Sequence, residues 1–174
     1  SGMTSLGTVT TSILAGKAAD SASNGNTAST STDASVTYDP VPRVTINQAA
    51  GQNDPANSAT INFTVMFSEA VTGFATGDID LYTTAGATTA AVSEIAPMNG
   101  TTYNVAVSGM SGDGEVIVGI LAGKAFDSGS NGNLASTSSD DTVVYKISAP
   151  SVTINQAAGQ NDPTNSSTIN FTAV

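Results

Sequence analysis

Apolar and polar residues alternate along short segments of this chain. The sequence Ile-Asn-Phe-Thr-Val-Met-Phe over residues 61–67 places an apolar residue at every second position. A period of two is typical of a β-strand with one buried face, because successive side chains of a strand point to opposite sides. Six further segments show short apolar runs or the same alternation and are also predicted strands: 44–47, 79–82, 90–95, 102–107, 116–121 and 142–147.

The segments between the predicted strands are rich in residues that favour turns. Gly-Gln-Asn-Asp-Pro at 51–55, Pro-Met-Asn-Gly at 97–100 and Ser-Gly-Asp-Gly at 111–114 are examples. About seven short strands separated by such turns predict an all-β fold, an immunoglobulin-like β-sandwich. The predicted core residues are Val44, Ile46, Ile61, Phe63, Val65, Phe74, Ile79, Leu81, Val92, Tyr103, Val105, Val116, Val118, Ile120, Val143 and Tyr145.

Parts of the sequence occur twice. The repeated blocks, earlier copy first, are 1–3 with 108–110, 13–17 with 120–124, and 44–55 with 152–163. The spacing is 107 residues for the first two pairs and 108 for the third, so one residue is gained at a proline-bearing junction, where a linker tolerates it. A period this long disfavours a β-helix or a calcium-binding β-roll, whose coils are much shorter.

The repeat divides the chain into three parts and predicts a tandem array. Residues 1–42 are the C-terminal part of a preceding immunoglobulin-like repeat, residues 43–149 form one complete repeat, and residues 150–174 are the N-terminal strands of a following one. Both flanking parts lack the middle strands and would expose apolar residues. The expected partners are therefore neighbouring repeats or identical chains, through strand pairing or end-to-end packing.

Composition excludes several kinds of chemistry. The chain has no Cys, His or Trp, which excludes thiol nucleophiles, disulfides and histidine metal ligands. Four Lys and Arg residues face fourteen Asp and Glu, for a net charge of −10, so nucleic-acid binding is not expected. No apolar run is long enough to span a membrane as a helix. The small, polar and weakly charged remainder is typical of extracellular or secreted repetitive β-proteins.

Four segments resemble the bacterial immunoglobulin-like repeats of large surface proteins and adhesins. They are 44–55, the sequence with Phe-Ser-Glu before Val-Thr-Gly-Phe at 61–74, Gly-Asp-Ile-Asp-Leu at 77–81, and Asp-Ser-Gly-Ser-Asn-Gly-Asn at 127–133. The resemblance implies an extracellular, cell-surface module that forms arrays. Such arrays act as stalks or fibres in cell adhesion, and related cadherin-like branches bind calcium between or within modules.

Any metal site in this chain must be built from oxygen ligands, and carboxylates with Asn and backbone carbonyls suit calcium. In the expected strand order, the turns that carry Asp54 and Asp113 lie at the C-terminal end of a module. Glu69 and Asp127 lie at its N-terminal end, and Asp162 repeats Asp54 in the following copy. Stacked modules bring these two ends together, so the five residues are candidate calcium ligands at a junction.

A purely structural interpretation of the same residues stays open. Asp54 and Asp127 lie in turns, where an Asp side chain commonly accepts hydrogen bonds from nearby backbone N–H groups. Moreover, not every acidic position is repeated, since Asp39 is aligned with Lys146. Calcium and turn formation are therefore alternative explanations for these carboxylates.

Enzymatic activity is not expected. Asp78 and Asp80 form a pair of carboxylates, as in glycosidases, but the chain lacks tryptophan and has only 5% aromatic residues to hold a sugar. Near-identical repeats are also more typical of spacers than of enzymes. Lys124 is the candidate for an intramolecular isopeptide bond, with a solvated strand-end charge as the alternative.

The sequence thus predicts a structural or adhesive module of an extracellular stalk or fibre. The alternative is a module whose loops bind a glycan or a host protein. A binding module is expected to concentrate unusual residues in one set of loops, whereas residues 21–32 and 128–139 are small, polar and nearly the same in both copies. The comparison of these loops favours the spacer.

Overall fold

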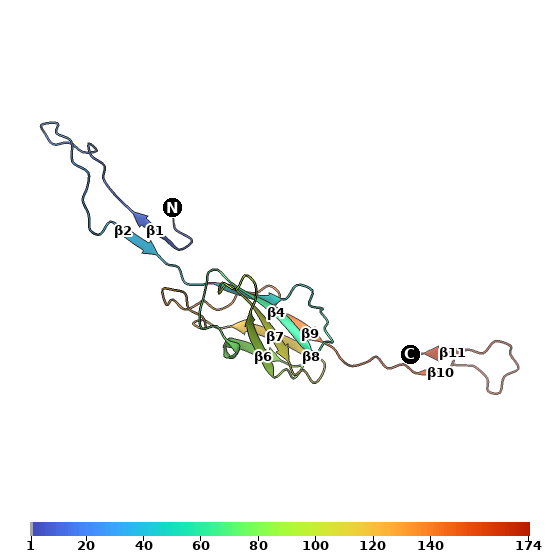
Figure 1. The fold of residues 1–174 in the computed structure, drawn as a ribbon. Helices are drawn as coiled ribbons and strands as arrows, with labels where there is room; N and C mark the ends of the chain where they lie inside the picture. Colours follow the sequence, from blue (N-terminus) through green and yellow to red (C-terminus); the bar gives the residue numbers. More distant parts are fainter. Residues whose placement is uncertain (1) are drawn as a thin grey trace.

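The computed structural model describes residues 2–174 and places two β-sheets in a compact body with a separate hairpin at each end (Figure 1). Ser1, where the first repeated block begins, lies outside the described residues. The strands of the body are β3 (Val44–Gln48), β4 (Thr60–Phe67), β5 (Ile79–Thr83), β6 (Thr89–Glu94), β7 (Thr102–Ser108), β8 (Gly114–Ile120) and β9 (Thr142–Tyr145). Within residues 2–174 no helix is long and apolar enough to cross a membrane, and the one helical element is the 3₁₀ turn η1 (Thr76–Asp78).

The body is a β-sandwich, and the prediction of an all-β fold is confirmed. One sheet has the strand order β3-β4-β7-β6 and the other β5-β8-β9, with antiparallel pairing throughout. One sheet thus holds the first, second, fifth and fourth strands of the body, and the other holds the third, sixth and seventh. All seven predicted strands are present, and their ends lie within two residues of the predicted ones.

The core lies between the two sheets and follows the alternation in the sequence. In β4 every second residue is buried, and Ile61, Phe63 and Val65 are fully enclosed. Four predicted core residues lie at its edge, only partly buried but packed against it: Phe74, Ile79, Leu81 and Val92. Phe74 forms an edge-to-face cluster with Phe67 and Tyr103, at ring-centroid distances of 5.3 and 5.1 Å, which closes one end of the core.

The two hairpins repeat strands of the sandwich but expose the residues that the sandwich buries. The N-terminal hairpin pairs β1 (Gly7–Thr10) with β2 (Ser35–Tyr38), and the C-terminal hairpin pairs β10 (Ile154–Gln156) with β11 (Phe171–Ala173). Phe171 is 64% exposed, whereas Phe63, which it repeats, is 0% exposed. The division of the chain at residues 42 and 149 stays a prediction, and the structure adds that each hairpin presents an apolar face.

The loop between β8 and β9 is organised around one buried amide. The Asn133 side-chain oxygen accepts hydrogen bonds from the backbone N–H groups of Lys124 (2.7 Å) and Ala125 (2.8 Å). Its NH₂ group donates to the carbonyls of Leu121 (3.1 Å) and Leu134 (2.7 Å). Asn133 therefore satisfies four backbone groups at the base of the loop, with 2% of its surface exposed.

We predict that Asn133→Ala lowers the free energy of unfolding of the sandwich by about 2 kcal/mol, because buried backbone groups lose their partners. Asn26 makes the equivalent four bonds in the exposed N-terminal hairpin, so Asn26→Ala is the matched control and is expected to have little effect. Urea unfolding followed by circular dichroism measures both variants. Equal losses in the two would contradict this account.

Candidate metal centre

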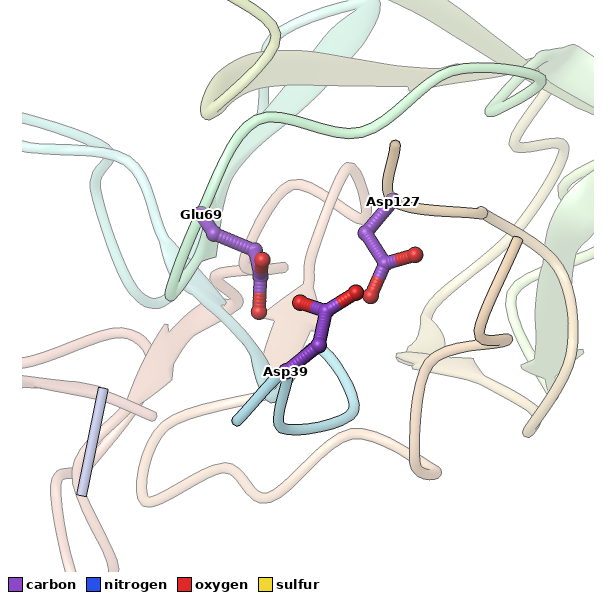
Figure 2. Close-up of side chains that lie close together, drawn as sticks. All are labelled: Asp39, Glu69 and Asp127. Carbon is purple, nitrogen blue, oxygen red and sulfur yellow. The ribbon is translucent and has the colours of Figure 1, made fainter. Parts of the chain in front are cut away.

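Three carboxylates from separate parts of the chain meet at the N-terminal end of the sandwich (Figure 2). Asp39 belongs to the linker between β2 and β3 (residues 39–43), Glu69 follows β4, and Asp127 lies in the loop between β8 and β9. One carboxylate oxygen from each residue lies within 4.8 Å of the other two. We call this group the acidic cluster.

Asp127 is held in place by its own loop. Its Oδ1 accepts a hydrogen bond from the backbone N–H of Asn131 at 2.8 Å, and its Oδ2 accepts one from the Asn131 side-chain amide at 2.9 Å. Burial opposes ionisation, but the hydrogen bonds from Asn131 and Gly129 outweigh it and hold the pKa of Asp127 below its usual value. Asp127 is therefore a preformed, ionised anion with 6% of its surface exposed.

The N-terminal hairpin shows which part of this arrangement is local. There Asp20 accepts the same two bonds from Asn24, at 2.9 and 3.1 Å, although the hairpin has no sandwich around it. The loop sequence alone therefore sets the conformation of the Asp127 loop, as the structural interpretation of the sequence proposed for Asp127. The convergence of Asp39 and Glu69 on Asp127 is the additional feature, and loop formation does not explain it.

Asp39 has a carboxylate oxygen that the described residues leave without a partner. Its Oδ2 accepts a hydrogen bond from the Asn131 side-chain amide at 3.2 Å, while its buried Oδ1 finds no donor in the part of the chain that the structure describes. A buried oxygen without a donor is costly, and more so when it carries charge. The Asp39 carboxylate lies between those of Glu69 and Asp127 in Figure 2.

Glu69 feels the negative charge of the cluster. Burial, together with the charges of Asp127 and Asp39, raises the pKa of Glu69 above its ordinary value. Two carboxylate charges 4.8 Å apart repel by about 0.9 kcal/mol even in bulk water, and by more at a partly buried site. A bound divalent cation would offset this repulsion, and the unpartnered Asp39 oxygen would then coordinate the cation.

The chemistry of the acidic cluster fits calcium. All three side chains offer hard oxygen ligands, and calcium takes six to eight oxygens from carboxylates, carbonyls and water in flexible geometry. Asp39, Glu69 and Asp127 would hold the ion, with water completing its coordination. The ion would supply positive charge and would tie the linker to two loops of the sandwich.

Two other predicted ligands lie at the opposite end of the sandwich and bind backbone. Asp54, in the turn between β3 and β4, accepts a hydrogen bond from the Val144 N–H at 2.9 Å. Asp113, just before β8, accepts from Ile147 and Ser148 at 2.8 and 3.0 Å. These two hydrogen bonds hold the pKa of Asp113 below its ordinary value, and the bond from Ile147 has the larger effect. Both side chains therefore position the last strand and the segment that leaves it.

The structure thus brings together Glu69 and Asp127 of the five predicted residues. Asp162 is exposed in the loop between β10 and β11, in the C-terminal hairpin. Asp39 is the cluster member that sequence reasoning missed, because its repeat partner is Lys146 and the position did not look like a repeated acid. The sequence signal is limited to its place in the linker that enters the module at the end predicted for Glu69, and it does not show that Asp39 turns toward Glu69.

Of the remaining charged candidates, Asp78 and Lys124 lie close to each other and Asp80 is exposed. Asp78 accepts a hydrogen bond from the Ala75 N–H at 2.8 Å, and its other oxygen lies 3.8 Å from the Lys124 ammonium. Asp80 is exposed on β5. The Lys124 side chain is 37% exposed and lies outside the apolar core in which an isopeptide bond forms.

We predict that Glu69→Gln raises the melting temperature of the calcium-free chain at pH 7. The pKa of Glu69 is higher in the folded state than its ordinary value of 4.5. As pH rises from 4.5 through the folded pKa, the unfolded state loses its proton first, so the free energy of unfolding falls. The gain is below about 1 kcal/mol, since the side chain is partly exposed and solvent screens it.

Glu115→Gln, which removes an exposed carboxylate outside the acidic cluster, serves as the control and is expected to leave the melting temperature unchanged. Below pH 4.5, the ordinary pKa of Glu69, this contribution to stability is no longer lost, so the difference in melting temperature between Glu69→Gln and the unsubstituted chain is expected to shrink at pH 4. A calcium-free Glu69→Gln chain that melts no higher at pH 7 would contradict the assignment of repulsion to this cluster.

Comparisons of the chain with known protein families, curated proteins and solved structures found no match.

Proposed function

We propose that residues 43–149 form an immunoglobulin-like module of an extracellular, bacterial-adhesin type of tandem array, a stalk or fibre at the cell surface. We further propose that calcium braces the junction between this module and the segment before it. The observation that carries the proposal is the acidic cluster, because it joins one carboxylate of the linker to two carboxylates of the sandwich. A cation there acts on the angle between consecutive parts of the chain.

The linker already has little freedom, which makes a single cross-link effective. Its sequence is Asp-Pro-Val-Pro-Arg over residues 39–43, and each proline fixes one backbone angle. The carbonyl of Pro42 accepts a hydrogen bond from the Leu134 N–H at 2.9 Å, which ties the end of the linker to the sandwich. Asp39 lies at the other end of the linker, so a cation on the acidic cluster would fix that end as well.

The loops support a spacer in preference to a module that recognises a ligand. Asn26 and Asn133 organise the same loop in two copies with the same four hydrogen bonds. Residues 21–32 and 128–139 are small and polar in both copies. A surface repeated in this way favours a building unit of an adhesive stalk.

Small-angle X-ray scattering of the full chain, with calcium and with a chelator, tests the calcium-braced junction. Calcium is expected to give a narrower distribution of overall dimensions, because it holds the linker, and with it the N-terminal hairpin, in one position relative to the sandwich. Asp39→Asn is expected to scatter the same way in both conditions, while Glu115→Gln keeps the calcium response. Identical scattering of the unsubstituted chain in both conditions would refute the braced junction.

A further inference from the structure

The C-terminal hairpin presents an apolar face whose counterpart is completely covered in the sandwich. Its residues are Val152, Ile154, Ile169 and Phe171, exposed by 77, 68, 58 and 64%. They repeat Val44, Ile46, Ile61 and Phe63, which are exposed by 2, 0, 0 and 0%. The chain therefore contains the same face twice, once covered and once open.

The N-terminal hairpin presents the complementary face. Its residues are Val9, Ile13, Val36 and Tyr38, exposed by 48, 59, 72 and 41%. They repeat Val116, Ile120, Val143 and Tyr145, which are exposed by 0, 1, 0 and 5%. Val116 and Ile120 belong to β8, and Val143 and Tyr145 belong to β9; both strands lie in the second sheet of the sandwich.

The sandwich shows what covers each face. β3 and β4 belong to one sheet and β8 and β9 to the other, and the residues named above form one core between them. β3 contacts both β8 and β9 directly. The natural cover for the C-terminal hairpin, which repeats β3 and β4, is therefore a hairpin that repeats β8 and β9.

Within one molecule the two hairpins lie at opposite ends of the sandwich (Figure 1). We propose that the C-terminal hairpin of one copy of this chain packs face to face on the N-terminal hairpin of a second copy. This contact joins two different surfaces, so it leaves one free hairpin of each kind and propagates into head-to-tail chains.

The charges permit this contact. Residues 150–174 carry a single charged side chain, Asp162, and residues 1–42 carry three Asp and one Lys, so most of the net charge of −10 belongs to the sandwich. The composite has counterparts of β3, β4, β8 and β9 but not of β5, β6 and β7. Its core is therefore smaller than that of the sandwich, and we expect weak, reversible association that depends on concentration.

Sedimentation equilibrium of the full chain, over roughly a hundredfold range of concentration, tests the proposal. The average mass is expected to rise from 17.2 kDa past that of a dimer as concentration increases. A chelator in every run separates this contact from the proposed calcium site. A mass that stays at 17.2 kDa would overturn the proposal.

Two single variants identify the contact. Phe171→Asp destroys the C-terminal face and Val36→Asp the N-terminal face, so each alone is expected to remain monomeric. Mixed in equal amounts, they retain one intact face of each kind and are expected to form a dimer that grows no further. Each substitution is at an exposed position outside the sandwich, so the melting temperature of the sandwich is expected to stay unchanged.

Tyr82→Asp is the matched control, because Tyr82 is 63% exposed but lies on the sandwich and not on a hairpin. This substitution is expected to leave association intact. If Val36→Asp still self-associates, two C-terminal hairpins pair with each other, and the head-to-tail contact is wrong. If Tyr82→Asp abolishes association, the sandwich surface carries the contact, and the proposal is also wrong.

Discussion

Replacing Phe63 with alanine is expected to lower the free energy of unfolding of the sandwich by about 3–5 kcal/mol, as is typical when a large buried aromatic side chain is removed. The same replacement at Phe171 is expected to change it by less than about 0.5 kcal/mol. Both residues are preceded by Ile-Asn in the repeated sequence, but Phe63 is fully buried and Phe171 is 64% exposed. The difference between the two variants therefore measures the contribution of the tertiary environment alone.

Urea unfolding followed by far-ultraviolet circular dichroism measures this difference. Phe63→Leu, a milder change that keeps most of the apolar volume, provides an intermediate value if the alanine variant does not fold. Similar losses at Phe63 and Phe171 would mean that the C-terminal hairpin is as well packed as the sandwich. That result would contradict the exposure on which the head-to-tail contact is built.

Calcium at a hundredfold excess over its dissociation constant is expected to stabilise the folded chain by about 2.7 kcal/mol. For a sandwich of this size the melting temperature rises by roughly ten degrees. Asp39→Asn is expected to lose most of this gain, because it removes one of the three charges that attract the ion. Differential scanning calorimetry with calcium and with a chelator measures both.

Asp54→Asn is the control, since Asp54 lies at the other end of the sandwich and the Asn side-chain oxygen still accepts the bond from Val144. It is expected to keep the full calcium response. Asp39→Lys reproduces the residue that the repeat places at this position, Lys146, and its ammonium is expected to stabilise the chain without calcium. A full calcium response in Asp39→Asn would remove the acidic cluster as the binding site.

The sequence predicted the strands and most of the core because alternation of apolar residues reports directly on which face of a strand is buried. It also placed Glu69 and Asp127 at one end of the module, since both follow the ends of strands that run toward that end. Asp39 could not be placed in the same way. Its position depends on the path of the linker, which is fixed by long-range contacts such as that between Leu134 and Pro42.

Local signals were also too weak in two places. The turn η1 is only three residues long and depends on a hydrogen bond from the Ala75 N–H to the Asp78 side chain, so no periodic pattern predicts it. The pattern also did not show that Phe74, a predicted core residue, is only partly buried. Its ring packs against the core from the edge and completes the cluster with Phe67 and Tyr103.

The turn after β3 also determines how the sandwich responds to tension. Ala56 pairs in parallel with Tyr145, and it is bound to the last strand by the bonds Ala56 N–H to Val144 O and Lys146 N–H to Ala56 O, each 2.8 Å long. The chain enters and leaves at opposite ends of the sandwich (Figure 1). A pull along the chain therefore loads these bonds in shear, so that they must break together instead of one after another. Under tension the sandwich is therefore expected to resist stretching where the segment around Ala56 meets the last strand, before the core between the sheets is disturbed.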